Sequence, residues 1–362
     1  MNILFDHQIF FEQRIGGVSR YHIELARSLE QVCADHVDIP VPIVLNAYLA
    51  DYTHRKLRTS VPDSLSRRLY QLTTLALDWK LRREQYDIVH LTWYKPRVLQ
   101  ACRGQKTVIT IHDMVQEIFG IDPVTVERKK YAAHQADGII AISESTKRDI
   151  LKFYPDIPED KIKVIYHGTN HLGQAVRPSS FPVPEKYLLF VGRRDGYKNA
   201  AFLMENLASL LKERTDLHLV FAGGGAFTQQ EETLLGQLEI RDRVLQETVS
   251  DGELAWLYQN AVCFLYPSKY EGFGFPILEA FDNRCPVLCS NASCLPEVGG
   301  DAVLYFSPED GGELRDRVNA IISDGELRRQ YIQRGAERVK LFTWEETARK
   351  TSTFYKKIAG QE

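Results

Sequence analysis

The sequence predicts two α/β domains, each with a parallel sheet covered by helices. The chain has 362 residues, which is too long for one ordinary hydrophobic core. Strand patterns alternate with helix patterns along the whole chain, as in doubly wound folds. A stretch rich in proline and serine interrupts this alternation once. We therefore expect a first domain at residues 1–172, a linker at 173–184 and a second domain at 185–344.

The first half contains five short runs of β-branched and apolar residues that are typical of buried strands. They lie at residues 2–6, 87–93, 106–113, 137–143 and 161–168. Between them, residues 18–29 and 144–154 carry apolar side chains at helical spacing. This order predicts strands that are joined by helical crossovers.

The second half repeats the alternation with five more strand patterns. They lie at residues 186–192, 218–224, 261–268, 285–290 and 302–308. Near the end of the chain, Thr343 and Glu346 have the spacing of a capping box, which predicts that a helix starts there. Ligands in such folds bind beyond the carboxyl ends of the strands, so we expect the site in the loops that follow them.

The composition excludes several classes of protein. Apolar residues make up 44% of the chain and charged residues 26%, so it can bury a core. The formal net charge of −3 argues against nucleic acid as the main partner, because phosphate neutralisation needs a basic excess. The first residues lack the basic start of a signal peptide, and no apolar run reaches the ~20 residues that span a bilayer. We expect a cytoplasmic protein, or one that lies peripherally on the inner face of a membrane.

A turn with two cations follows the first strand of the second half. Gly192 ends that strand, Arg193 and Lys198 stand in the turn, and Asn199 is a candidate N-cap for the next helix. An arginine fork and a lysine point charge together suit a diphosphate. The alternative is an ordinary loop with two solvated basic residues.

Three glycines, beginning at Gly223, follow the next strand. They permit the close approach of a flat ligand, although a plain turn explains them almost as well. The run is not Gly-x-Gly-x-x-Gly, because its sixth position is Thr228. The glycines therefore support a site only together with the neighbouring turns.

A pair of glutamates frames a third glycine-rich turn. Gly272 and Gly274 permit unusual backbone angles, and Pro276 suits the first position of a helix. The N–H groups and positive dipole end of that helix would attract phosphate. We place Glu279 in the first helical turn, as a candidate for binding ribose hydroxyls, and Glu271 before the turn, as a candidate for binding a sugar. A favourable first-turn acid would explain Glu279 equally well, but not the whole arrangement.

No metal or other cofactor is expected. Two aspartates separated by a single residue, a spacing that can bind a metal ion, are absent from the sequence. The six cysteines form no Cys-x-x-Cys pair and no zinc-type spacing with histidine, so we expect free thiols. Walker A, Gly-x-Ser-x-Gly and His-Glu-x-x-His motifs are absent as well.

Together these stretches resemble glycosyltransferase family 4, whose members have the GT-B fold and retain the configuration of the transferred sugar. The family's Glu-x7-Glu signature matches Glu271 and Glu279, and its Gly-Arg-x4-Lys-Asn signature matches residues 192–199. The family's glycine loop matches residues 16–17, and its His-Asp pair matches residues 112–113. The resemblance covers nearly the whole chain and implies that a C-terminal helix, residues 345–362, packs back on the first domain.

The resemblance implies a role for each matched residue. Arg193 and Lys198 would hold the donor diphosphate, Glu279 the ribose, and Glu271 the transferred sugar. From the residues alone His112 is more often structural, and only the resemblance places it against that sugar. The implied catalytic residues are Glu271, His112, Arg193 and Lys198. The implied donor-binding residues are Gly16, Gly17, Asp113, Gly192, Arg193, Lys198, Gly223, Glu271, Gly272, Phe273, Gly274, Phe275 and Glu279.

The resemblance implies a nucleotide-sugar-dependent hexosyltransferase. Relatives with similar sequences often build bacterial surface polysaccharides and many use GDP-mannose, so mannose is the favoured sugar, with UDP- and dTDP-sugars as alternatives. The acceptor would be a glycan or a lipid-linked glycan. Two other interpretations are another GT-B enzyme, such as a sugar-nucleotide epimerase or a phosphorylase, and a non-catalytic glycan-binding subunit.

A basic segment at residues 54–83 has eight Lys or Arg against two acids. It contains a helical stripe made of Leu65, Leu69, Leu72, Ala76 and Trp79. The favoured interpretation is an ordinary helix with its apolar side on the core and its charges in solvent. The alternative is a surface that binds an anionic membrane near a lipid-linked acceptor.

Overall fold

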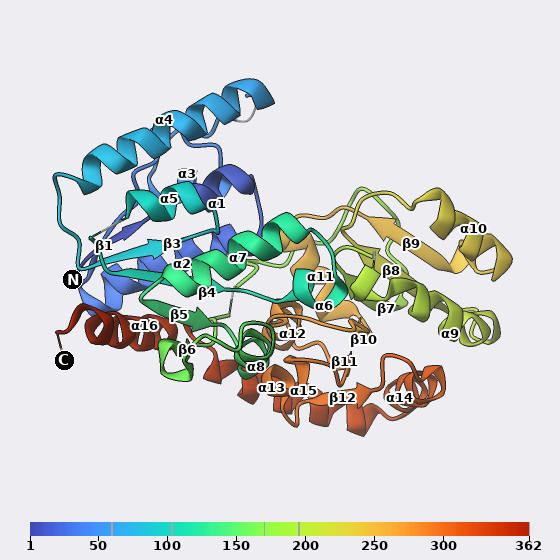
Figure 1. Cartoon of the computed structure of the whole chain (residues 1–362). Helices are drawn as coiled ribbons and strands as arrows, with labels where there is room; N and C mark the ends of the chain where they lie inside the picture. Colours follow the sequence, from blue (N-terminus) through green and yellow to red (C-terminus); the bar gives the residue numbers. More distant parts are fainter. Residues whose placement is uncertain (59–60, 103, 170, 195, 362) are drawn as a thin grey trace. The chain divides into compact units, whose positions relative to one another are not determined.

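The computed structural model describes residues 1–58, 61–102, 104–169, 171–194 and 196–361, and only the backbone of Asp63. The chain divides into two compact units. Unit 1 contains Met1–Gly168 and Thr343–Glu362, and unit 2 contains Thr169–Phe342. Within the described residues each unit has one six-stranded parallel sheet with helices, which confirms the predicted α/β class (Figure 1).

The sheet of unit 1 has the order β2-β1-β3-β4-β5-β6. Its strands are β1 (Asn2–Phe5), β2 (His36–Asp38), β3 (Ile88–Leu91), β4 (Thr107–Ile111), β5 (Gly138–Ala141) and β6 (Ile162–Val164). The helices of this unit are α1 (Gln8–Glu12), α2 (Gly17–Cys33), α3 (Ala47–Tyr52), α4 (Asp63–Leu81), α5 (Pro96–Ala101), α6 (Val115–Phe119), α7 (Pro123–Gln135), α8 (Glu144–Phe153) and α16 (Trp344–Ala359). A 3₁₀ turn, η1 (Glu159–Lys161), leads into β6.

Alternate strand residues of unit 1 point to opposite faces of the sheet, as the period of a strand requires. Ile3, Ile88 and Ile140 pack against α2 and α16 on one face. Leu4, Val89 and Ile139 pack against α4, α5, α7 and α8 on the other. Both faces are covered, so the strands are nearly continuous runs of apolar residues.

The sheet of unit 2 has the order β12-β11-β10-β7-β8-β9. Its strands are β7 (Lys186–Val191), β8 (Leu217–Ala222), β9 (Val244–Glu247), β10 (Cys263–Tyr266), β11 (Val287–Ser290) and β12 (Val303–Phe306). Its helices are α9 (Ala200–Glu213), α10 (Gln229–Gln237), α11 (Asp251–Asn260), α12 (Phe275–Asp282), α13 (Leu295–Gly299), α14 (Gly311–Ser323) and α15 (Gly325–Arg338). Three 3₁₀ turns, η2 (Gly196–Lys198), η3 (Arg241–Arg243) and η4 (Val339–Leu341), complete it. One buried cluster joins α9 and α14 to all six of these strands.

The ten predicted strands are confirmed within the described residues. Two strands were not predicted, β2 and β9, and each forms an edge of its sheet. The predicted start of the last helix is also confirmed, because the Thr343 side chain accepts a hydrogen bond from the backbone N–H of Glu346. All six cysteines lie in the described part of the chain and are free thiols, as expected.

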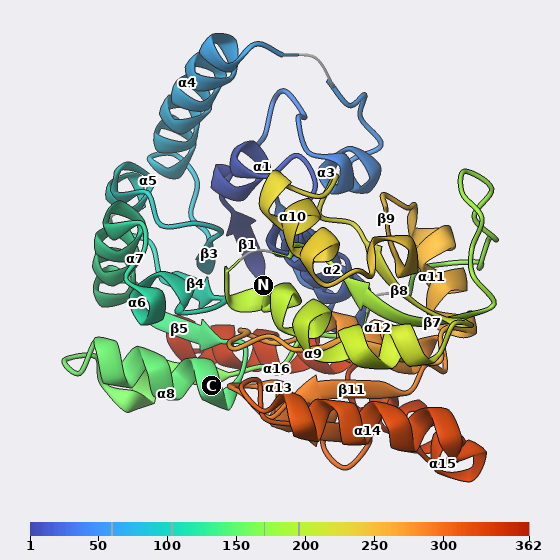
Figure 2. The ribbon, with the colours of Figure 1, turned by 90° about the vertical axis from the view of Figure 1, so that its right-hand side faces the viewer.

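The favoured interpretation of the basic segment is wrong. Leu65, Leu72 and Trp79 are 46%, 62% and 57% exposed, so most of the stripe faces solvent. Leu77 and Leu81, which are not part of the stripe, hold α4 on the core instead. The helix lies along the margin of unit 1 in both views (Figures 1 and 2).

Candidate functional site

The strand order of unit 2 places the two predicted phosphate-binding turns side by side. The chain runs outward from β7 to β8 and β9, and then returns to β10 on the other side of β7. The order therefore reverses between β7 and β10, and α/β sheets bind ligands at such a switch point. Residues 192–199 follow β7, and residues 267–274 follow β10.

Lys198 and Glu271, which are 73 positions apart, meet at this point. The Lys198 ammonium donates hydrogen bonds to both carboxylate oxygens of Glu271, at 2.7 and 3.0 Å. The two side chains are only 20% and 11% exposed, so the pair is partly shielded from water. The ring of Tyr266 lies 5.7 Å from the ammonium. Burial, and the Glu271 carboxylate beside it, raise the pKa of Tyr266, so this phenol stays protonated.

Hydrogen bonds between side chains and backbone hold the two turns in place. The side-chain amide nitrogen of Asn199 donates to the carbonyls of Pro267 and Pro308, at 3.2 and 2.9 Å. Asn199 is the N-cap of α9 by position, but its side chain does not cap the helix because it makes these two bonds instead. The Glu271 N–H donates to the Ser293 hydroxyl at 2.9 Å. These bonds fix the backbone beneath the Lys198–Glu271 pair.

Gly192 and Gly223 allow the first turn and its neighbour to approach closely. Both have positive φ values, 108° and 88°, which glycine adopts without strain. A Cβ atom on Gly223 would lie 3.8 Å from the Cα of Gly192, so little side-chain volume separates the two backbones. This leaves backbone exposed at the carboxyl edge of β7 and β8.

The proline-led helix differs from the prediction in one respect. Helix α12 begins at Phe275, with Gly274 as its N-cap at φ 98° and Pro276 in its first turn. Glu279 is therefore the fifth residue of the helix and lies in the second turn, not the first. There it accepts a long, 3.5 Å hydrogen bond from the hydroxyl of Tyr258, on the neighbouring α11.

Arg193 and Arg194, which follow β7, have different environments. Arg193 is exposed at the turn, as a ligand-binding cation should be. Arg194 is buried and makes hydrogen bonds to Glu231 at 2.7 Å and to the carbonyls of Gly223 and Ala226. It therefore secures the glycine turn after β8. The role of Arg194 was not predicted from the sequence. One signal was present, because Thr228 and Glu231 have the spacing of a capping box, and Glu231 is the residue that pairs with Arg194.

The remaining predicted residues of the turn after β10 are mostly buried. Gly272 and Phe273 are buried, and Phe275 is half-buried. The rings of Phe273 and Phe275 are 5.5 Å apart at 66°, an edge-to-face arrangement. The apolar side chains thus anchor the turn.

In unit 1 the strand order reverses between β1 and β3, where Gly16 and Gly17 lie, whereas His112 and Asp113 follow the next strand, β4. Gly16 and Gly17 begin α2, and Tyr21, one turn further on, lies edge-to-face with His112 at 4.9 Å. The His112 Nε2 atom is buried and has no hydrogen-bond partner among the described residues. Burial, and then the charge of Lys129, lower the pKa of His112 to about 3, so its imidazole is neutral at ordinary pH.

Asp113 has a structural contact. Its carboxylate accepts a hydrogen bond from the N–H of Val115 at 3.1 Å, which starts α6. The buried ammonium of Lys129 donates to the Asp113 carbonyl at 2.9 Å and to Glu117 at 2.9 Å. The loop after β4, which carries His112, is thereby fastened to α6 and α7.

Among the described residues, no group of three or more His, Cys, Asp or Glu side chains is placed to hold a metal ion. No helix of the described chain has both the length and the apolar character needed to cross a membrane.

Two family models match the chain, and together they cover most of it. Residues 174–338 match "Glycosyl transferases group 1", and residues 15–171 match "Glycosyltransferase Family 4". The chain is 29% identical to O-antigen chain mannosyltransferase B of Escherichia coli, over 77% of this chain and 76% of that one. It is 26% identical to alpha-maltose-1-phosphate synthase of Mycolicibacterium smegmatis, over 95% of this chain and 96% of the relative.

Solved structures share the fold over the whole chain. A sucrose-phosphate synthase from Thermosynechococcus elongatus has a TM-score of 0.76 at 20% identity, with 100% of both chains covered. Anabaena HepE, solved in complex with UDP and glucose, has a TM-score of 0.76 at 17% identity, over 99% of this chain and 100% of the other. The chain belongs to glycosyltransferase family 4 and is a hexosyltransferase with the GT-B fold.

Proposed function

We propose that this enzyme transfers mannose from GDP-mannose to a glycan or a lipid-linked glycan in polysaccharide synthesis, with retention of configuration and without a metal ion. The observation that carries the donor assignment is the Lys198–Glu271 pair at the switch point of unit 2. The choice of mannose is supported by relatives that are named mannosyltransferases, one of them in O-antigen synthesis.

The pair suits a sugar diphosphate because Lys198 offers a positive charge to the diphosphate and Glu271 a negative charge to the sugar. An ammonium has three N–H donors, and Glu271 accepts two hydrogen bonds from Lys198. The third donor is available to a diphosphate oxygen, beside Arg193 and the N-terminus of α12. Glu271 would then lie against the sugar, where a carboxylate stabilises the positive charge that develops at the anomeric carbon.

The reaction breaks the bond between the anomeric carbon and the diphosphate oxygen. The acceptor hydroxyl oxygen forms the new bond to that carbon, and its proton passes to the departing diphosphate. Arg193 and Lys198 stabilise the negative charge on the leaving group. His112 is neutral at ordinary pH, so it would not act as a general acid.

A donor panel tests this function. The enzyme is incubated with GDP-mannose, UDP-glucose, UDP-N-acetylglucosamine or dTDP-glucose, and release of the nucleoside diphosphate is measured. We expect GDP release from GDP-mannose, and a thermal shift with GDP that Arg193→Ala abolishes. Preferred turnover of a UDP-sugar would overturn the mannose assignment, and release of a new nucleotide sugar without an acceptor would indicate an epimerase.

We also propose that α4 binds an anionic membrane, which would bring the enzyme to a lipid-linked acceptor. The solvent side of this helix exposes Leu65, Leu72, Leu75 and Trp79 at helical spacing. Exposed arginines flank this row, and the guanidinium of Arg83 lies 4.1 Å from the Trp79 ring. Apolar side chains beside cations are the pattern of a helix that lies in a bilayer interface.

Vesicle sedimentation tests the α4 proposal. We expect the chain to bind phosphatidylglycerol vesicles at low salt, and Leu72→Ser with Trp79→Ser to reduce binding at least tenfold. Leu341→Ser, which changes an exposed leucine of unit 2, is the matched control. Equal binding by all three proteins, or equal binding to neutral phosphatidylcholine, would contradict the proposal.

A further inference from the structure

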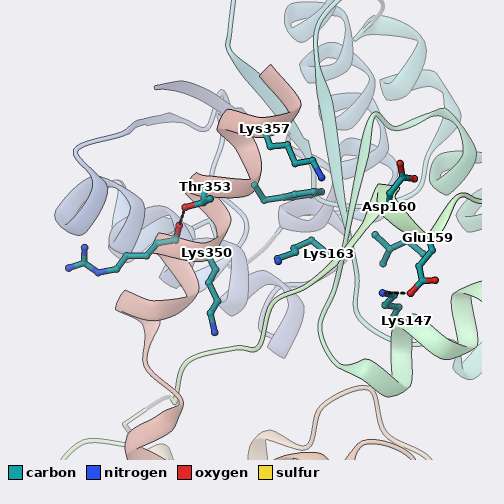
Figure 3. Close-up of a pocket in the computed structure, with 10 residues that line it drawn as sticks. Lys147, Glu159, Asp160, Lys163, Lys350, Thr353 and Lys357 are labelled. Carbon is teal, nitrogen blue, oxygen red and sulfur yellow. Dashed lines mark hydrogen bonds and ion pairs between the residues drawn. The ribbon is translucent and has the colours of Figure 1, made fainter. Parts of the chain in front are cut away.

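A hollow of about 690 Å³ lies in unit 1, at the sheet edge formed by β6 (Figure 3). It is lined by α16, by the turn that leads into β6, and by Lys147 of α8. Within the described residues, β6 pairs with β5 alone. Its outer side therefore presents backbone N–H and C=O groups that no neighbouring strand uses.

The lining carries an excess of positive charge. Its cations are Lys147, Lys163, Arg349, Lys350 and Lys357, and its carboxylates are Glu159 and Asp160. Lys147 is paired with Glu159 at 2.8 Å, and Lys350 with Glu346 at 3.2 Å. In the part of the chain that the structure describes, the other three cations make no ion pair, and Asp160 is the one remaining carboxylate of the lining.

Two of these unpaired cations come from opposite walls. Lys163 projects from the sheet edge toward α16, and Lys357 projects from α16 toward the sheet edge (Figure 3). Between these walls lie two buried apolar side chains, Ile162 and Phe354, which are 5% and 4% exposed. Phe354 also covers the first residue of β5, since a Cβ on Gly138 would lie 2.9 Å from its ring. The apolar base of the hollow is thus fixed by the core.

We propose that this hollow binds a small phosphate ester, such as a phosphorylated sugar. Three unpaired cations exceed what one carboxylate neutralises, whereas a phosphate monoester carries a charge of about −1.5 to −2 and three acceptor oxygens. The volume is that of a small-molecule site and is too large for a bare ion. The apolar base suits the carbon skeleton of the ester.

A membrane or a protein fits this hollow less well than a small molecule. None of the large apolar side chains that the described chain exposes lies in its lining, whereas α4 exposes four. Interfaces with lipid or protein depend on such apolar anchors. The proposal does not depend on the donor or the acceptor of the enzyme.

Titration calorimetry with glucose 1-phosphate tests the proposal. Every variant carries Arg193→Ala and Lys198→Ala, so that a phosphate site in unit 2 cannot account for the binding. In this background we expect binding of glucose 1-phosphate but not of glucose, and at least tenfold weaker binding after Lys163→Glu with Lys357→Glu. Both lysines are exposed, so the substitutions should leave the thermal midpoint without ligand unchanged.

Lys356→Glu is the matched control, because Lys356 is exposed on the same helix but does not line the hollow. We expect it to bind glucose 1-phosphate like its parent. Equal binding after the double charge reversal, or an equal loss after Lys356→Glu, would overturn the proposal. Loss of phosphatidylglycerol vesicle binding after the double reversal, without any binding of glucose 1-phosphate, would also overturn it and assign the cations to a lipid phosphate.

Discussion

Replacing Lys198 by alanine tests whether this lysine binds the donor or only neutralises Glu271. In the structure the ammonium donates two hydrogen bonds to that carboxylate. If Lys198 also holds a diphosphate oxygen, its removal costs a hydrogen bond between charged groups, about 1.5–3 kcal/mol. At 1.4 kcal/mol for each factor of ten, that is roughly a tenfold to hundredfold loss of affinity.

The assay is calorimetric binding of GDP to four proteins: wild type, Lys198→Ala, Glu271→Gln and the double variant. We expect Lys198→Ala to weaken GDP binding by at least tenfold in both backgrounds. Glu271→Gln alone should strengthen binding, because the diphosphate no longer competes with a carboxylate for the ammonium. The cycle separates the two roles, since it isolates the energy of the pair from that of each partner.

The control is Lys186→Ala. Lys186 forms an ion pair of similar length with Asp216, at 2.6 Å, but its side chain is 62% exposed and lies at the other end of β7. This variant should bind GDP like the wild type, because exposed pairs contribute little and this one is remote from the site. The reasoning is refuted if the double variant binds GDP as tightly as Glu271→Gln, since Lys198 would then act only on the carboxylate.

Three further predictions concern pH, backbone strain and metal. Burial lowers the pKa of five histidines in unit 1 below the 6.5 of the unfolded chain. They are His7, His22, His90, His112 and His167. The unfolded chain therefore binds more protons below that pH, and unit 1 should lose up to about 1.4 kcal/mol per histidine at pH 5.5. Amide protection factors, which are corrected for the intrinsic pH dependence of exchange, should fall in unit 1 relative to unit 2, and protection factors that do not change with pH would contradict this. Gly274→Ala should lower the thermal midpoint by several degrees, because φ at this position is 98° and the new Cβ would lie 2.9 Å from Leu295. Gly17→Ala is the control and should leave the midpoint unchanged, because Gly17 is helical and a Cβ there would meet open space. EDTA should leave turnover unchanged, and loss of activity that Mg²⁺ or Mn²⁺ restores would refute the metal-free mechanism.

The sequence predicted the core strands because each is buried on both faces, so its apolar run is continuous. Residues 36–38 and 244–247 gave no such signal: each forms an edge strand, and most of its residues are half-buried or exposed. The sequence predicted the turns that carry Lys198 and Glu271, but not that the two side chains meet. Their contact depends on β7 and β10 being neighbours in the sheet, and the sequence pattern does not give that strand order. Resemblance supplied their roles.

Three errors have local physical causes. The start of α12 was placed one residue late, because Gly274 reaches a positive φ and lets Phe275 begin the helix ahead of the proline. Asn199 was expected to cap α9, but two carbonyls at strand ends compete for its side chain. The apolar stripe of α4 was assigned to the core because periodicity shows that one face is apolar, but not which way that face points.

The two basic surfaces of unit 1 illustrate why charge alone does not identify a partner. Helix α4 and the hollow beside β6 both carry several Lys and Arg side chains, and the net charge of the chain conceals both. They differ in where their apolar side chains lie. On α4, Leu72 and Trp79 project into solvent, where they gain free energy only by entering another apolar phase. In the hollow, Ile162 and Phe354 are already buried, so the driving force there is electrostatic and falls with salt. Binding at α4 should therefore persist in part at salt concentrations that abolish binding in the hollow.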